Sequence, residues 1–314
     1  MGDGYLSKAE ADSINSLMPG NQVYGVGSKI RNALMLGIGW PEGLKAYVDG
    51  VNGANSGFDG FAWDTPFKTI NHAVACLEDT DRGGLIVVAP GDYNEAVVVS
   101  KDNIMVMGAG NPLAVRVKPL TAGAAAMYAL GQKTCLVNLD LVGQDAAPKG
   151  TRVRGDGFRA FGCKFEMNND LGVALYFDPE NIDGNTASLA IVEDCEFAWA
   201  EVGAYFSWGA GWICTQSAFR RNWFHNVSVI HVMGDAAAVS VENLELTDNV
   251  HDNLGDGTVP SGHYIDLHEA GNTGIVSGCR FACPTNAVGR NLVAAGILWV
   301  ANMTEAGITA ARPA

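Results

Sequence analysis

The sequence predicts an all-β fold in which short parallel strands stack into a solenoid, and two observations support this prediction. A strand motif returns six times between residues 137 and 283, at intervals of 22 to 35 residues. One amphipathic helix precedes these strands, and strand patterns follow it for the rest of the chain. Repeats of 20 to 50 residues with a strand in each are typical of solenoids.

Residues 1–46 show no strand pattern, and we expect them to form an arm ahead of the main domain. Ser7 to Glu10 have the form of a helix capping box, and GSKIRNALMLGIGW (27–40) is a second, apolar stretch. Its apolar residues are expected either to pack back on the body of the protein or to dock onto another protein. These residues are Leu34, Met35, Leu36, Ile38 and Trp40.

The main domain opens with a glycine- and asparagine-rich loop, YVDGVNGANSG (47–57), and a helix of about three turns. Asp64 and Thr65 are expected as the N-cap, and Pro66 suits the first turn. One face of this helix is apolar at helical spacing. The residues on this face are Phe67, Ile70, Val74 and Leu77.

Strands follow the helix directly. LIVVAPGDYNEAVVV (85–99) predicts a strand, a Pro-Gly turn and a second strand, and IMVMGAG (104–110) predicts a third.

The repeated motif then places a core residue, one outward residue and a large apolar residue in each coil. The aligned segments are VNLDLVG (137–143), FGCKFEM (161–167), EDCEFAW (193–199), RRNWFHN (220–226), ENLELTD (242–248) and SGCRFAC (277–283). Their outward positions are Asp140, Lys164, Glu196, Trp223, Glu245 and Arg280. Because the charges alternate except at the tryptophan, we expect a ladder that fixes the strand register. Successive acids never meet in this column, so a two-carboxylate site is not expected on this face.

The opening of the domain resembles a known family. The first coil of a parallel stack leaves unpaired backbone groups, and a helix laid across that end closes it. The segment from YVDGVNGANSG to IVVAPGDYNE resembles the N-terminal cap and first coil of right-handed parallel β-helices of the pectin-lyase-like class, a pattern common in phage virion proteins and tail spikes. The resemblance implies a β-helix domain at 47–314, with a cap at 47–84, coils at 85–300 and a tail at 301–314.

Charge and composition exclude several partners. The chain has 20 Lys and Arg residues against 34 Asp and Glu, a formal net charge of −14, so no nucleic-acid partner is expected. No apolar run is long enough to cross a bilayer, and the N-terminus lacks a secretory pattern, so we expect no membrane partner and synthesis in a cytoplasm. The seven cysteines form no CxxC pair, and we expect buried thiols with no metal or cofactor.

Polar side chains are densest at residues 248–269, where His251, Asp252, Asp266 and His268 are weak catalytic candidates. Alternation places Tyr264, Asp266 and His268 on one strand face. A carboxylate beside a histidine can act as an acid and base pair or bind a divalent ion. A solvated loop with one amphipathic strand is the preferred interpretation, because no metal-ligand spacing accompanies the set.

Three tryptophans are expected at the surface: Trp199, Trp208 and Trp223. A subunit interface is their preferred role, ahead of core packing and of stacking on a host surface glycan.

The preferred function is a structural virion protein of a bacteriophage, located on the virion surface and contacting capsid or tail proteins. The arm would anchor it as a capsid decoration protein or a short spike, and the resemblance implies a trimer. Decoration is favoured because roughly eight coils stand only about 40 Å tall. One alternative is a polysaccharide-degrading tail spike, a lyase or glycosidase, although no lyase motif can be matched to this chain. The other alternative is a surface adhesin.

Overall fold

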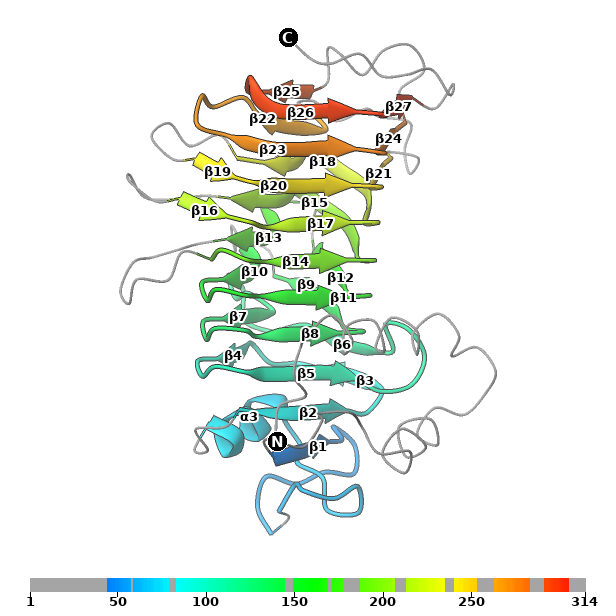
Figure 1. Cartoon of the computed structure of the whole chain (residues 1–314). Coiled ribbons are helices and arrows are strands. Elements are labelled where there is room, and N and C mark those ends of the chain that lie inside the picture. Colours follow the sequence, from blue (N-terminus) through cyan, green and yellow to red (C-terminus); the bar gives the residue numbers. More distant parts are fainter. Residues whose placement is uncertain are drawn as a thin grey trace, which may run out of the picture.

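The computed structural model describes residues 44–57, 59–78, 83–144, 149–168, 171–177, 187–206, 213–234, 240–252, 263–282 and 291–304. These residues form a right-handed parallel β-helix, in which strands from successive coils lie one above the next (Figure 1). The all-β solenoid fold is therefore confirmed. No helix in this part of the chain is long and apolar enough to cross a membrane.

The first sheet has ten parallel strands, one from each rung, and it faces the viewer in Figure 1. In spatial order they are β1 (Leu44–Val48), β2 (Gly84–Val88), β5 (Ile104–Gly108), β8 (Cys135–Val137), β11 (Arg159–Phe161), β14 (Ile191–Glu193), β17 (Ala218–Arg220), β20 (Leu244–Thr247), β23 (Thr273–Ser277) and β26 (Gly296–Val300).

Fifteen further strands form one hydrogen-bonded sheet that divides into two parts, here called the second and third sheets. The second sheet contains β3 (Gly91–Tyr93), β6 (Val115–Val117), β9 (Asp140–Gly143), β12 (Lys164–Met167), β21 (Val250–His251), β24 (Arg280–Phe281) and β27 (Met303–Thr304). The third contains β4 (Val97–Val99), β7 (Met127–Ala129), β10 (Lys149–Val153), β13 (Val173–Phe177), β22 (Ile265–Leu267) and β25 (Asn291–Val293). The long strands β15 (Glu196–Phe206) and β18 (Trp223–Met233) run through both, and β16 (Ile213–Thr215) pairs separately with β19 (Ser240–Glu242).

The core lies inside the coil, because alternate side chains of every strand point inward. One inward column of the second sheet is aromatic, with successive ring centroids 5.2, 4.4, 5.0 and 4.9 Å apart. Its members are Phe165, Phe197, Phe224, His251 and Phe281. Rings stacked at this spacing repeat the distance between neighbouring strands, so one column of side chains follows the axis of the solenoid.

A sharp bend joins the first sheet to the second in each coil from residue 138 onward. The residue at the bend has a left-handed conformation, with φ between 53° and 64°. These residues are Asn138, Gly162, Asp194, Arg221, Asp248, Gly278 and Ala301. Asparagine side chains that follow the bend bridge neighbouring coils: Asn222 Oδ1 accepts from the Cys195 N–H at 2.9 Å, and Asn249 Oδ1 accepts from the Asn222 N–H at 2.9 Å. These bonds satisfy backbone donors that the bend leaves without a strand partner.

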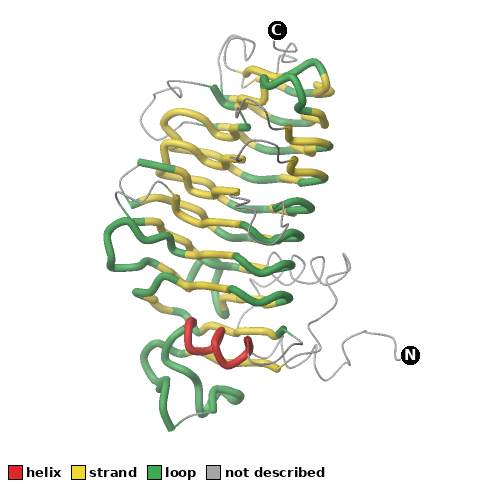
Figure 2. The backbone as a smooth tube through the Cα atoms, turned by 90° about the vertical axis from the view of Figure 1, so that its left-hand side faces the viewer, coloured by secondary structure: helices red, strands yellow, loops and turns green. Residues whose placement is uncertain are grey.

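The helix, α3 (Ile70–Glu78), buries the expected apolar face, but it begins later than expected. Thr69 Oγ1 accepts from the His72 N–H at 3.3 Å, and the Glu95 carboxylate accepts from the Ile70 and Asn71 N–H groups at 2.7 and 2.9 Å. A carboxylate from a later coil therefore caps the helix, which local sequence cannot reveal. The helix lies near the β1 end of the stack (Figure 2), and its role as a closing cap stays a prediction.

Strands extend beyond the expected boundaries of the coils at both ends. Strand β1 begins at Leu44, inside the segment expected as an arm, and pairs with β2. Strand β27 lies at Met303–Thr304, in the expected tail. The arm residues Leu34, Met35, Leu36, Ile38 and Trp40 lie outside the described residues.

One repeat was aligned wrongly. Glu245 pairs with Ala218 in the first sheet, and Val250 takes the place next to Trp223 in the second. Leu244 and Leu246 have the spacing expected for a strand of the second sheet, but they belong to the first. Strands of both sheets alternate apolar and polar residues in the same way, so the spacing alone does not distinguish them.

Candidate functional site

A column of charged side chains runs along the outward side of the second sheet. Asp140, Lys164, Glu196 and Trp223 are successive Cα partners on β9, β12, β15 and β18, as expected. Arg116 on β6 precedes Asp140 in the same column and extends the alternation of charge by one coil. Strands that pair in parallel and in register bring every second residue to one surface, which forms the candidate site.

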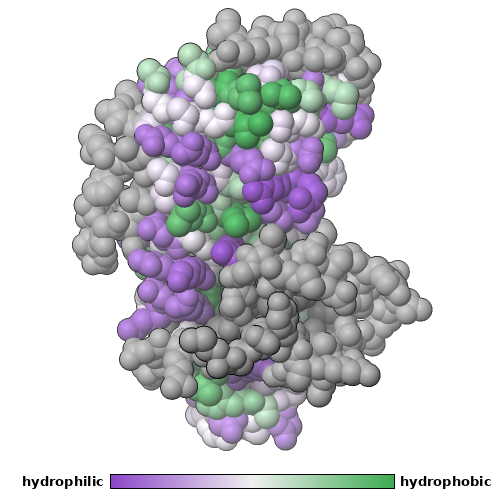
Figure 3. All heavy atoms as spheres, viewed as in Figure 1, coloured by the Kyte–Doolittle hydropathy of each residue, from purple (hydrophilic) through white to green (hydrophobic). Residues whose placement is uncertain are grey.

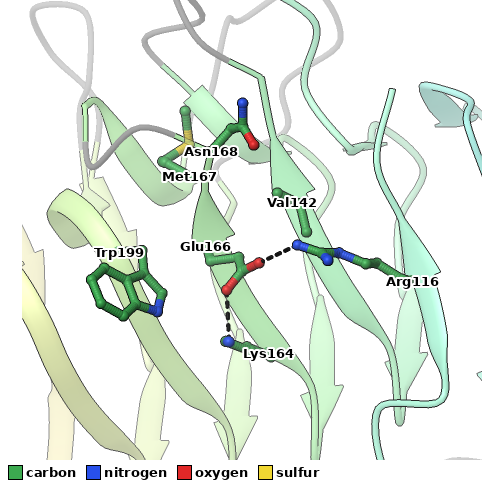
Figure 4. A pocket seen from close by; sticks show the side chains of 7 residues that line it. All are labelled: Arg116, Val142, Lys164, Glu166, Met167, Asn168 and Trp199. Carbon is green, nitrogen blue, oxygen red and sulfur yellow. Dashed lines mark hydrogen bonds and ion pairs between the residues drawn. The ribbon is translucent and has the colours of Figure 1, made fainter. Parts of the chain in front are cut away.

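A second carboxylate joins this surface. Glu166 lies two residues after Lys164 on β12, so it points to the same side of the sheet. Its Oε1 lies 2.9 Å from Arg116 Nη2 and its Oε2 lies 2.7 Å from Lys164 Nζ (Figure 4). The sequence analysis considered a single outward column, and Glu166 belongs to the next one, so this second carboxylate was not expected; whether the two acids form a site stays a hypothesis.

The pKa of the Asp140 carboxyl is strongly shifted. Burial and the nearby charge of Glu166 raise the pKa of its carboxyl to about 6, although Arg116 Nε lies 3.4 Å from Asp140 Oδ2. Its buried Oδ1 has no hydrogen-bond partner among the described residues. A carboxyl with a pKa raised to about 6 thus lies near a carboxylate held by two cations, an arrangement suited to acid and base chemistry.

The charge network continues from Lys164 to the next two coils. Burial opposes the charge of Lys164, but hydrogen bonding to Glu166 and the nearby carboxylates raise its pKa. Lys164 Nζ also lies 3.5 Å from Glu196 Oε1. His225 Nδ1 lies 3.1 Å from the amide nitrogen of Asn226, which can only donate, so His225 Nε2 carries the proton donated to Glu196 at 2.9 Å. This hydrogen bond lowers the pKa of Glu196.

An open pocket of about 460 Å³ borders the part of this network formed by Arg116, Lys164 and Glu166. It is lined by Arg116, Val142, Lys164, Glu166, Met167, Asn168 and Trp199. Trp199 and Arg116 stand on opposite sides of the Glu166 carboxylate (Figure 4). Trp199 occupies a left-handed position (φ 51°) within β15, so its ring projects from the sheet with 44% of the residue exposed.

A second tryptophan extends the surface by one coil. Trp223 is also 44% exposed, and its ring stacks on His225 with centroids 3.9 Å apart. The structure therefore places both described tryptophan candidates at the surface, and Trp208 lies outside the described residues.

The histidine expected as a catalytic candidate at position 251 belongs to the core instead. His251 is fully buried between Phe224 and Phe281, and its Nδ1 lies 3.3 Å from His231 Nδ1. Burial lowers the pKa of His251 to about 3. Asp252, next along the chain, is also buried. A catalytic role for His251 was a wrong prediction, because the strand register turns this position inward.

Asp266 and His268 do meet, but in the third sheet and away from the pocket. Asp266 Oδ1 lies 2.5 Å from His268 Nδ1, and His268 Nε2 lies 3.3 Å from Glu269 Oε1. Since both ring nitrogens face carboxylates, the ring is poorly placed to accept a substrate proton. Tyr264 does not share their face: it is buried against the core, and its hydroxyl donates to the Ala282 carbonyl at 2.8 Å.

The described residues were also compared with the ligand sets that hold metal ions in proteins. In the part of the chain that the structure describes, no group of three or more His, Cys, Asp or Glu side chains is placed to hold a metal ion.

The buried histidine predicts a loss of stability in acid. Its pKa is lowered in the folded state, so the unfolded chain takes up the proton first, and stability present above about pH 6.5 is lost as pH falls toward 3. We expect the free energy of unfolding to fall by roughly 1.4 kcal/mol per pH unit from this group. His251→Phe should flatten this slope in urea titrations between pH 7 and 4. An unchanged slope would mean that other groups cause the acid lability.

Comparisons with known proteins support the fold alone. No family model and no curated protein matches the chain. Among solved structures, YbhC of Escherichia coli shares 12% identity at a TM-score of 0.56, covering 85% of this chain and 87% of that chain. Pectate lyase Pel9A shares 14% identity at 0.53, covering 85% and 70%. The GH136 lacto-N-biosidase of Eubacterium ramulus shares 11% identity at 0.51, covering 90% and 58%.

Proposed function

We propose that this protein binds a polysaccharide across the outward side of its second sheet and hydrolyses it there. The observation that carries the proposal is the acid pair: Asp140, with its pKa raised to about 6, beside Glu166, whose carboxylate is held by Arg116 and Lys164. Glycoside hydrolysis uses two carboxyl groups, one as the acid and the other as the base or nucleophile. The similar folds include a pectate lyase and a lacto-N-biosidase, which agrees with this proposal and does not carry it.

The chemistry divides between the two acids. Asp140 donates its proton to the glycosidic oxygen as the bond from that oxygen to the anomeric carbon breaks. Glu166 stabilises the positive charge that develops on the sugar ring, or takes the proton of the attacking water. Water supplies the hydroxyl group of the new reducing end, and the proton left over restores the acid. Arg116 Nη2 and Lys164 Nζ hold the Glu166 carboxylate in place at 2.9 and 2.7 Å.

The substrate is assigned as a polymer because the surface is long and open. The exposed rings of Trp199 and Trp223 come from neighbouring coils, and flat rings pack against the apolar faces of sugars. A chain of sugars lying across β12, β15 and β18 would touch both rings and the pocket together.

The first test is an assay on a panel of bacterial and plant polysaccharides. We expect new reducing ends without unsaturated sugars from at least one polymer, and loss of this activity in Glu166→Gln. Unsaturated products would contradict hydrolysis and indicate a lyase. A protein inert on every polymer, with no binding to any, would refute the proposal.

Removing a tryptophan ring tests sugar binding separately from cleavage. Trp199→Ala and Trp223→Ala are each expected to weaken binding of the cleaved polymer by roughly threefold to tenfold, because each removes one stacking surface. Calorimetry or affinity electrophoresis measures the change. Leu298→Ala is the matched control, since Leu298 is an exposed apolar residue of the first sheet. Equal effects at all three positions would argue against a tryptophan-lined binding surface.

A second candidate is a structural virion protein, a trimeric capsid decoration protein or short spike of a bacteriophage. The observation in its favour is that each acid of the site has a cationic or histidine partner: Asp140 has Arg116, Glu166 has Arg116 and Lys164, and Glu196 has Lys164 and His225. Such a ladder also serves to hold coils in register. A stable trimer by light scattering that is inert on the whole panel would favour this candidate.

A further inference from the structure

The first sheet carries an apolar surface on its outward side. Side chains that alternate with the core residues of β2, β5, β8 and β11 form one contiguous cluster, here called the apolar face. Its members are Leu85, Val87, Met105, Met107, Cys135, Val137 and Phe161. Each is only 2 to 5% exposed, although none of them points into the coil. Side chains on the outside of a sheet reach such low exposure only when something lies over them.

The same side of the sheet is more polar over β14, β17 and β20. Arg220 lies between Glu193 and Glu245, with nitrogen–oxygen distances of 2.9 and 2.5 Å. In Figure 3, hydrophilic side chains gather over the middle of this side of the molecule. The apolar face therefore ends where a solvated surface begins, after four coils.

Four described hydrophobic residues pack against the apolar face, and each of them is only partly buried. The partly buried hydrophobic residues packed against it are Tyr47, Trp63, Ala109 and Ile191. Tyr47 and Trp63 contact each other with ring centroids 4.7 Å apart. The indole Nε1 of Trp63 is buried and has no hydrogen-bond partner among the described residues.

Among the undescribed segments that adjoin strands of this sheet, one has the right chemistry. Residues 79–82 (DTDR) and 178–186 (DPENIDGNT) are polar and short. Residues 1–43 lead directly into β1, the strand next to β2 in this sheet, and contain the apolar run 34–40 (LMLGIGW). Fourteen residues span about 21 Å even if helical, enough to cross four coils spaced about 4.8 Å apart, and in an extended segment residues two positions apart share one face.

We propose that residues 27–40 of the N-terminal arm dock on the apolar face of their own chain. Leu34, Leu36 and Trp40 then supply the apolar contacts, and the arm belongs to the fold rather than to an interface with another protein. This assignment is independent of the proposed enzymatic function.

Cys135 provides a reporter inside the apolar face. Burial raises the pKa of its thiol to about 12, whereas Cys163 and Cys195 belong to the core inside the coil. In the full-length chain carrying Leu34→Asp and Leu36→Asp, we expect N-ethylmaleimide to label Cys135 at least tenfold faster, with each site resolved by mass spectrometry. Labelling of Cys163 and Cys195 should stay slow, which shows that the coil remains folded. Asn32→Asp, a polar change in the same segment, is the matched control and should leave Cys135 protected.

A dilution series on the unmodified protein identifies which copy supplies the arm. Protection of Cys135 that is unchanged over a hundredfold dilution supports docking within one chain. Protection that falls on dilution would assign the cover to a second copy and overturn the proposal. Cys135 that stays protected in the Leu34→Asp, Leu36→Asp chain would overturn it as well, because another segment would then be the cover.

Discussion

Phe197→Ala is expected to lower the free energy of unfolding by about 3–5 kcal/mol, the usual cost of emptying a buried phenylalanine site. Phe197 is fully buried, and its ring stacks between Phe165 and Phe224 with centroids 5.2 and 4.4 Å away. Phe219 of the first sheet contacts it from across the coil at 6.3 Å. The cavity would lie between rings that the backbone ladder holds at fixed spacing, so they cannot move together to fill it.

Urea denaturation measures this loss, and a neighbouring position provides the control. Trp223→Ala removes a larger side chain from the outward side of β18, where it is half exposed, and should cost less than about 1 kcal/mol. Phe197→Leu should fall between the two, because it keeps most of the apolar volume. Comparable losses at positions 197 and 223 would show that the aromatic column does not dominate the stability of the solenoid.

Asp140→Asn is expected to reduce turnover of the polysaccharide by 10²- to 10⁴-fold, the range that a general acid contributes. In the unmodified protein, kcat/KM should fall as pH rises through about 6, because Asp140 must be protonated to donate. In the Asp140→Asn variant, kcat/KM should no longer fall as pH rises through about 6. Activity retained by Asp140→Asn, with the same pH profile, would remove Asp140 from the mechanism.

The same substitution should make the protein more stable at alkaline pH. The pKa of Asp140 is raised in the folded state, so its contribution to stability is complete below about pH 4 and is lost as pH rises through about 6. At pH 8 a neutral asparagine avoids this loss, which amounts to as much as about 3 kcal/mol. Urea titrations at pH 8 and pH 4 measure the difference. Asp140→Asn that destabilises at pH 8 would indicate a purely structural pair with Arg116.

Alternation in the sequence predicted most of the solenoid. The outward column from Asp140 to Trp223 and the inward phenylalanines 165, 197 and 224 follow from a two-residue period within each strand. At 242–248 this alternation led to the wrong sheet, because strands of the first and second sheets have the same two-residue period. A left-handed bend before the second sheet distinguishes them: Asp248, with φ 55°, precedes Asn249 and Val250, as Arg221 precedes Asn222 and Trp223.

The candidate site was harder to predict than the fold. Arg116, Asp140 and Glu166 lie on three different coils, and the 50 residues between Arg116 and Glu166 carry no motif that joins them. The repeat correctly predicted Lys164 next to Asp140, but it did not indicate Glu166, which lies two residues after Lys164 on the same strand. His251 was chosen as a candidate because it is polar, but it lies in an inward column of the second sheet. Only the structure shows that it is buried among aromatic rings.

The sequence by itself determined that the chain forms a solenoid, which residues alternate inward and outward, and which face of the helix is apolar, because these depend on neighbours a few residues apart. Only the tertiary structure decided which coils share a column, where Glu95 caps the helix, and how burial raises the pKa of Asp140. Those features depend on the offset between paired strands, which is 23 to 32 residues in the second sheet, and loops of variable length conceal that offset from any local pattern.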